Sequence, residues 1–117
     1  MYANLLKNWQ DMTYCELPTP EIGDGEALVR MKYAGACGSD ITVYDGKHMT
    51  ATAPVVLGHE ILGTIERISP DSDFAPGERV TAYPLISCCE CYACKAGNRH
   101  VCRELKLLGI HVNGGYE

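Results

Sequence analysis

The sequence lacks several features that would assign it to a common class of protein. None of its apolar runs is long enough to cross a membrane, so we expect no membrane partner. Basic residues are few, 10 against 15 acidic ones, and the net charge of −5 argues against a nucleic-acid partner, which selects for a basic face. The N-terminus does not combine a basic segment with a long apolar stretch, so we expect a cytoplasmic protein without a signal peptide.

A glycine fingerprint for dinucleotide binding is also missing. The segment Gly35-Ala36-Cys37-Gly38 has glycines at its two ends only, and no long helical pattern follows it. At 117 residues the chain has the length of one domain. We therefore expect a single domain that holds no dinucleotide site of its own.

Short extended segments separated by glycine and proline make up most of the sequence. The expected strands are Tyr2–Lys7, Met12–Leu17, Ala27–Tyr33, Ile61–Ile68 and Arg79–Tyr83. Only Ser39–Tyr44 and part of Cys91–Ala96 have a helical pattern, and both are short. This organisation predicts a mainly β fold, either a barrel or a sandwich.

Seven cysteines are present, and five of them lie between Cys88 and Cys102. Cys88, Cys91, Cys94 and Cys102 form the pattern C-x2-C-x2-C-x7-C, whose spacing lets four thiolates converge on one tetrahedral Zn²⁺. Four protein ligands leave no position for substrate, so this zinc is predicted to be structural and to order the polar loop 88–102. Cys89 breaks the spacing and is interpreted as a free thiol.

Three alternatives compete with zinc in this loop. Disulfides are disfavoured by the odd number of cysteines and by the absence of an export signal. The bacterial iron–sulfur pattern has a last gap of about three residues followed by proline, whereas here the gap is seven and Arg103 follows. A zinc module that grips nucleic acid is disfavoured by the acidic charge.

A second group of candidate ligands lies upstream of the cysteine loop. Taken alone, a single cysteine or histidine is more often a core residue than a ligand. Here Cys37 and His59 each neighbour a glycine and a carboxylate, and Cys37, His59 and Glu60 would supply the three ligands of a catalytic zinc with one open position. Asp40 is then available to accept a hydrogen bond from the ring nitrogen of His59 that does not bind metal.

These motifs together resemble the zinc-containing medium-chain alcohol dehydrogenases. The resemblance is carried by Cys37-Gly38-Ser39-Asp40, by Gly58-His59-Glu60-x-x-Gly63 and by the four-cysteine loop, in the order that the family has them. Pro76–Val80 resembles the family's PGDRV, and the segment Leu107–Tyr116 also matches. The sorbitol (L-iditol), threonine and sugar-acid dehydrogenases are the most similar subgroup.

The resemblance implies a GroES-like, partly open β-barrel, here residues 1–117 with a structural-zinc lobe at 88–102. In the family this domain is joined to a Rossmann domain that binds NAD or NADP, and that domain is absent from this chain. Cys37, His59 and Glu60 match the ligands of the catalytic zinc, and Ser39 matches the hydroxyl that takes the substrate proton. The expected substrate is a small alcohol, polyol or sugar acid, and a homo-oligomer is compatible with the family.

Two departures from the family pattern bear on function: the residue at position 42 and the end of the sequence at Glu117, before the family's Rossmann domain. Many relatives have a histidine at the position of Thr42, so the proton relay here must end in water, another side chain or the cofactor's ribose. Our first hypothesis is that the chain is the N-terminal part of a longer zinc-dependent dehydrogenase and is inactive alone. The second is a short, non-catalytic zinc-binding module that retains the barrel.

Overall fold

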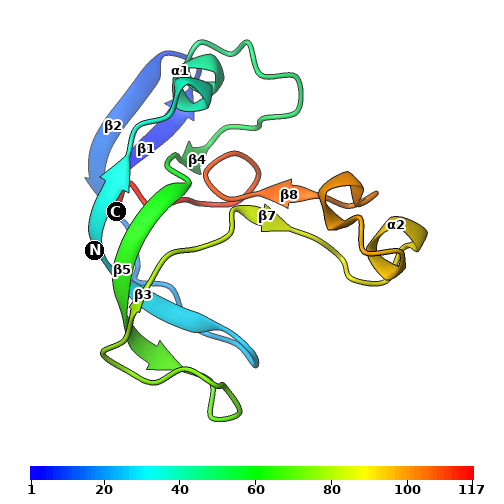
Figure 1. The fold of residues 1–117 in the computed structure, drawn as a ribbon. Coiled ribbons are helices and arrows are strands. Elements are labelled where there is room, and N and C mark those ends of the chain that lie inside the picture. Colours follow the sequence, from blue (N-terminus) through cyan, green and yellow to red (C-terminus); the bar gives the residue numbers. More distant parts are fainter.

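A computed structural model describes all residues, 1–117 (Figure 1). Most of the regular secondary structure is in strands: β1 (Tyr2–Asn8), β2 (Asp11–Glu16), β3 (Ala27–Gly35), β4 (Val55–Val56), β5 (Glu60–Ile68), β6 (Arg79–Val80), β7 (Leu85–Ile86) and β8 (Lys106–Leu107). The helices are α1 (Gly38–Tyr44), α2 (Tyr92–Lys95) and the 3₁₀ turn η1 (Arg99–Val101). The prediction of a mainly β fold with short helices is confirmed. No helix has the length and apolar character needed to span a bilayer.

The strands form three small antiparallel sheets, in the orders β2-β1-β4, β3-β5-β6 and β7-β8. In Figure 1 the first two sheets curve around one side of the molecule, and β7 and β8 lead away from them to a separate lobe that carries α2. The sheets are open rather than closed into a full barrel, as the family resemblance implied.

The C-terminal segment is bonded to β1 and to the segment between β4 and β5. The Asn4 N–H in β1 donates to the Tyr116 carbonyl at 2.8 Å, and the Tyr116 N–H donates to the Leu57 carbonyl at 3.0 Å. Gly114 must lack a side chain, because a Cβ there would overlap the backbone carbonyl of Gly58. This segment therefore runs against the backbone that leads into β5, where the candidate site lies.

A small apolar core lies beneath α1, between β1 and the segment before β5. Its members are each no more than 5% exposed: Leu6, Val43, Val55, Leu57 and Ile110. Val43 belongs to α1 and Leu57 lies two residues before His59. The burial of this core therefore fixes α1 relative to the start of β5, and with them the two segments that carry Cys37 and His59.

Two of the expected strands differ from the structure in their extent or pairing. β3 continues to Gly35, two residues beyond the expected end, and its pairing with β5 has register shifts between Leu28 and Val29 and between Met31 and Tyr33. The strand expected at Arg79–Tyr83 pairs with β5 only through Arg79 and Val80.

Candidate metal centres

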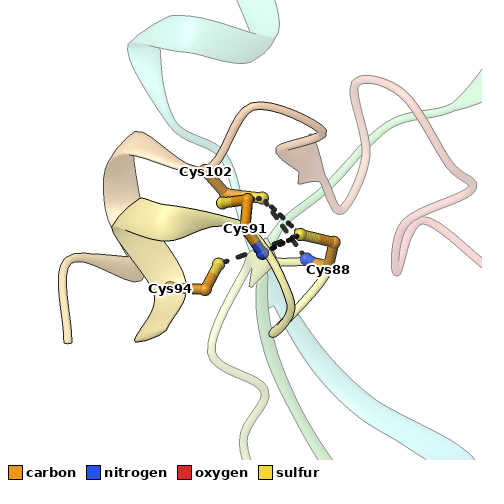
Figure 2. Close-up of side chains that lie close together, drawn as sticks. All are labelled: Cys88, Cys91, Cys94 and Cys102. Carbon is orange, nitrogen blue, oxygen red and sulfur yellow. Dashed lines mark hydrogen bonds between the residues drawn. The ribbon is translucent and has the colours of Figure 1, made fainter. Parts of the chain in front are cut away.

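Four cysteines converge in the lobe at 88–102, each from a different piece of local structure (Figure 2). Cys88 follows β7, Cys91 lies at the N-terminal boundary of α2 and Cys94 is inside that helix. Cys102 ends η1. Two turns of chain thus return the fourth thiol to the first, as the spacing predicts. Cys89 is exposed, and its sulfur lies 3.7 Å from Ser87 Oγ, outside the cluster.

The sulfur–sulfur distances suit a metal rather than disulfides. Cys102 Sγ lies 3.4 Å from Cys88 Sγ, and the Cys88–Cys94 and Cys91–Cys102 sulfur pairs are each 4.0 Å apart. Four sulfurs placed about 2.3 Å from one Zn²⁺ in a tetrahedron would be about 3.8 Å apart, whereas a disulfide requires about 2.05 Å. All seven cysteines are free thiols.

Backbone amides surround these sulfurs. The N–H groups of Cys88 and Glu104 both donate to Cys102 Sγ at 3.3 Å, and the Cys91 N–H donates to Cys88 Sγ at 3.4 Å. Amides of Arg103 and Cys94 lower the pKa of the Cys91 thiol to about 6, and the Cys88 amide is the main cause of the lowered pKa of Cys102.

Burial acts in the opposite direction on the thiols of this cluster, and at Cys94 it is the largest effect. It raises the pKa of the Cys94 thiol to about 12. Cys91 and Cys102 are therefore held in surroundings that favour the thiolate, the form that binds metal. Cys94 needs a bound cation to lose its proton near neutral pH.

The second cluster joins Cys37, His59 and Glu60, whose ligand atoms lie within 4.8 Å of one another. Strand pairing explains this meeting. Gly35 ends β3 and pairs with Glu60, the first residue of β5. The segment after β3 and the segment before β5 are therefore neighbours at this edge of the sheet. Cys37 follows two residues after Gly35 and precedes α1, while His59 immediately precedes Glu60. Ser39 belongs to the same place, with its Oγ 3.3 Å from His59 Nε2.

Asp40 is the one charged residue in the interior, 5% exposed, and it binds the backbone on both sides of this cluster. Its Oδ2 accepts the Cys37 N–H at 2.9 Å, and its Oδ1 accepts the Gly58 N–H at 3.3 Å. Oδ1 also lies 3.5 Å from His59 Nδ1, a buried nitrogen that has no hydrogen-bond partner. Asp40 thus lies on the expected side of the imidazole, at a distance slightly longer than a hydrogen bond of about 2.7–3.2 Å.

Thr42 and His48 lie outside this arrangement. The Thr42 hydroxyl donates to the Gly38 carbonyl within its own helix at 3.2 Å. His48 accepts the Thr50 N–H at 3.4 Å through Nδ1, and its ring faces that of His111 edge-on. Neither side chain is bonded to Ser39.

Tyr116 is the residue at this site that sequence reasoning missed. Its hydroxyl donates to Asp40 Oδ2 at 2.9 Å. Burial, together with the neighbouring Asp40 carboxylate, raises the pKa of Tyr116 to about 12, so the phenol stays a donor. Seventy-six residues separate the two in sequence, and no motif spacing links them. The only available signal was the position of Tyr116 in a segment already matched to a family pattern.

A mainly β domain with a four-thiol lobe and a separate Cys–His–carboxylate cluster has the donor sets of a zinc-binding domain. The family model of the alcohol dehydrogenase GroES-like domain matches residues 23–117 of this chain. The chain therefore belongs to the GroES-like domain family of the alcohol dehydrogenases, as the sequence motifs predicted.

Three proteins of known sequence are similar to this chain. The starvation-sensing protein RspB of Escherichia coli K12 is 43% identical over 102 residues, which are 86% of this chain and 30% of that protein. A zinc-type alcohol dehydrogenase-like protein of Haemophilus influenzae is 38% identical over 104 residues, 87% of this chain and 30% of that protein. L-galactonate-5-dehydrogenase of E. coli K12 is 38% identical over 102 residues, 86% of this chain and 29% of that protein.

Solved structures agree in fold. An alcohol dehydrogenase of E. coli CFT073, complexed with the cofactor NADH, matches with a TM-score of 0.91 and 37% identity. The match covers 99% of this chain and 34% of that one. The prediction of a GroES-like fold is confirmed, and the chain spans about a third of the length of its relatives.

Proposed function

We propose that the chain is the N-terminal catalytic part of a zinc-dependent dehydrogenase that oxidises a secondary alcohol with NAD or NADP. The observation that carries this proposal is the meeting of Cys37, His59 and Glu60, with ligand atoms within 4.8 Å, beside the Ser39 hydroxyl. Residues 1–117 would form the GroES-like domain with the zinc lobe at 88–102. A Rossmann domain for the dinucleotide would be supplied by further residues of the protein.

The donor sets suit two zinc ions of different kinds. Four cysteine sulfurs at 3.4–4.0 Å spacing support a structural ion held by Cys88, Cys91, Cys94 and Cys102. One thiol, one imidazole and one carboxylate support a catalytic ion held by Cys37, His59 and Glu60. Zinc in the second set would supply Lewis-acid chemistry, lowering the pKa of an alcohol bound at its open position.

The chain's own residues would bind the substrate and carry its proton. Ser39 would take the proton of the substrate hydroxyl, and this role is supported by the 3.3 Å between its Oγ and the candidate ligand nitrogen of His59. Because the Thr42 hydroxyl is directed to the Gly38 carbonyl, the proton would leave Ser39 through water, another side chain or the cofactor's ribose. A depression of about 560 Å³ lined by His59, Glu60 and Thr81 gives a substrate room to approach.

The substrate class proposed is a polyol, a sugar acid or a similar small secondary alcohol. The support is the subgroup resemblance of the motifs and the identity shared with L-galactonate-5-dehydrogenase. Seven free thiols are typical of a reducing compartment, which agrees with a cytoplasmic location. A homo-oligomer agrees with the same proposal.

The test is an oxidation screen with the complete gene product. Polyols, sugar acids and threonine are offered with NAD or NADP, and reduced cofactor is followed by absorbance. Turnover with one of these classes is expected, and Ser39→Ala should lower kcat by about 10²–10⁴-fold, the usual contribution of a positioned proton-transfer group. The 117-residue chain alone should show none. Absence of turnover with every substrate, or activity of the isolated chain, would refute the proposal.

A non-catalytic zinc-binding module is the second candidate. One observation favours it: the four-cysteine lobe is complete within these residues and needs no contribution from elsewhere. This candidate predicts one zinc per chain in the complete gene product, bound at the lobe, and no effect of Ser39→Ala on any measured property.

A further inference from the structure

Tyr116 is fixed to the backbone on both sides of the candidate catalytic cluster. Its N–H donates to the Leu57 carbonyl at 3.0 Å, and its carbonyl accepts the Asn4 N–H of β1 at 2.8 Å. Leu57 is 1% exposed and lies two residues before His59. These two hydrogen bonds fix the backbone of Tyr116 beside the segment that carries His59.

The ring of Tyr116 covers the residue that precedes His59. A Cβ at Gly58 would lie 2.5 Å from Tyr116 Cδ1 and 2.7 Å from Cε1, so the ring packs directly on the glycine backbone. Gly58 has φ +94°, a conformation that glycine adopts without steric penalty. The ring contact and the backbone conformation of Gly58 together fix the backbone position of His59.

The hydroxyl of Tyr116 has two acceptors within reach and one proton. Asp40 Oδ2 lies at 2.9 Å and the Gly35 carbonyl at 3.2 Å. The shorter bond, to an ionised acceptor, is the stronger of the two. Asp40 Oδ2 then accepts both this hydroxyl and the Cys37 N–H, which leaves Oδ1 to the Gly58 N–H and to the side facing His59 Nδ1.

We propose that Tyr116 is a positioning residue of the Cys37–His59–Glu60 site, acting through Asp40. Its hydroxyl holds the Asp40 carboxylate in the rotamer that presents Oδ1 to His59 Nδ1. At 3.5 Å the negative charge of Oδ1 favours a ring proton on Nδ1, which leaves Nε2, the nitrogen beside Ser39, free to bind metal. The inference rests on the proposed function only for the identity of the bound ion. Partners of this kind typically change metal affinity by about 10–100-fold.

The test compares Tyr116→Phe with the matched variant Tyr44→Phe. Both keep the aromatic ring and lose one hydroxyl at the edge of the same core, and the Tyr44 hydroxyl donates to the Gln10 carbonyl at 3.0 Å, away from Asp40. Co²⁺ is the probe, with affinity measured by chelator competition on the complete gene product. Binding by one thiolate and by four differs in the strength of the charge-transfer absorption, so the two centres are read separately.

Tyr116→Phe should weaken Co²⁺ binding at the one-thiolate centre by about 10–100-fold, with the four-thiolate centre unchanged. Tyr44→Phe should leave both unchanged. Equal affinity in wild type and Tyr116→Phe would overturn the inference and leave the proposed function standing. The same loss in Tyr44→Phe would also overturn it, by showing a general effect of hydroxyl removal.

A second readout needs no metal. At mildly alkaline pH, ¹⁵N chemical shifts report which ring nitrogen of His59 carries the proton. Wild type and Tyr44→Phe should show the Nδ1–H tautomer, and Tyr116→Phe a mixture. An unchanged tautomer would overturn the inference. If the tautomer changes but wild type binds no Co²⁺ at the one-thiolate centre, the positioning role stands and the proposed function fails.

Discussion

Replacing Gly58 by alanine tests the packing of Tyr116 against the backbone that carries His59. Two penalties combine at this position. Gly58 has φ +94°, and a left-handed conformation costs an ordinary L-residue about 1–2 kcal/mol. The new methyl group would also lie 2.5 Å from Tyr116 Cδ1, an overpacking contact that costs about 1–3 kcal/mol. The free energy of unfolding should therefore fall by about 2–5 kcal/mol.

Gly77→Ala is the matched control for this prediction. Gly77 has φ +91°, and a Cβ there would have no atom within 4 Å. It should lose only the conformational part, about 1–2 kcal/mol. Both variants gain the same small stabilisation from a less flexible unfolded chain, so this contribution cancels in the comparison.

Urea denaturation, followed by circular dichroism, gives the two free energies. Gly58→Ala should be less stable than Gly77→Ala by about 1–3 kcal/mol, and this difference should shrink in a Tyr116→Ala background, where the ring is missing. Equal destabilisation of the two variants would refute the contact between Gly58 and Tyr116, and with it the packing on which the position of His59 depends.

Three further predictions concern zinc binding by the lobe, the fall in stability at alkaline pH and the packing of the core. Cys91→Ser should reduce the zinc content by one ion per chain, while Cys89→Ser, outside the cluster, should retain it; elemental analysis decides, and equal loss in both would contradict the ligand set. The pKa of Tyr116 is about 12 in the folded chain and about 10 when unfolded, so its contribution to stability is complete below pH 10 and is lost as the pH rises toward 12. Tyr116→Phe should flatten that decline in stability, measured by denaturation at each pH, and an unchanged slope would contradict the assignment. Leu6→Ala, at a fully buried site, should cost about 2–5 kcal/mol, against less than about 0.5 kcal/mol for Met49→Ala, which is 97% exposed; similar denaturation midpoints would contradict the core assignment.

The long strands and α1 could be predicted from the sequence because each has enough residues to show a pattern. β1, β2 and β5 were expected within a residue or two of their observed bounds. β4, β7 and β8 have two residues each, too few for any alternation to appear, and they form only because a partner strand is already in place. The bulges in β3 depend on its pairing with β5, which a periodicity argument does not contain.

The two groups of candidate ligands were predictable because their members are marked by short-range patterns, Cys37 next to glycine, His59 next to Glu60, and the cysteine spacing. Their meeting in space agrees with those patterns. Apart from the approach of Asp40 to His59, the contacts that support these ligands were not predictable. Asp40 reaches the Gly58 amide eighteen residues away and the Tyr116 hydroxyl seventy-six residues away. Such contacts are set by the packing of α1 against the C-terminal segment, for which the sequence has no local signal.

Anomalous diffraction at the zinc absorption edge, from crystals of the complete gene product, tests the central claim most directly. The account predicts two peaks per chain, one among the sulfurs of Cys88, Cys91, Cys94 and Cys102 and one between Cys37, His59 and Glu60. A single peak in the lobe, with Cys37, His59 and Glu60 enclosing no metal in protein saturated with zinc, would contradict the assignment of a catalytic centre. An iron signal in the lobe would contradict the structural-zinc assignment.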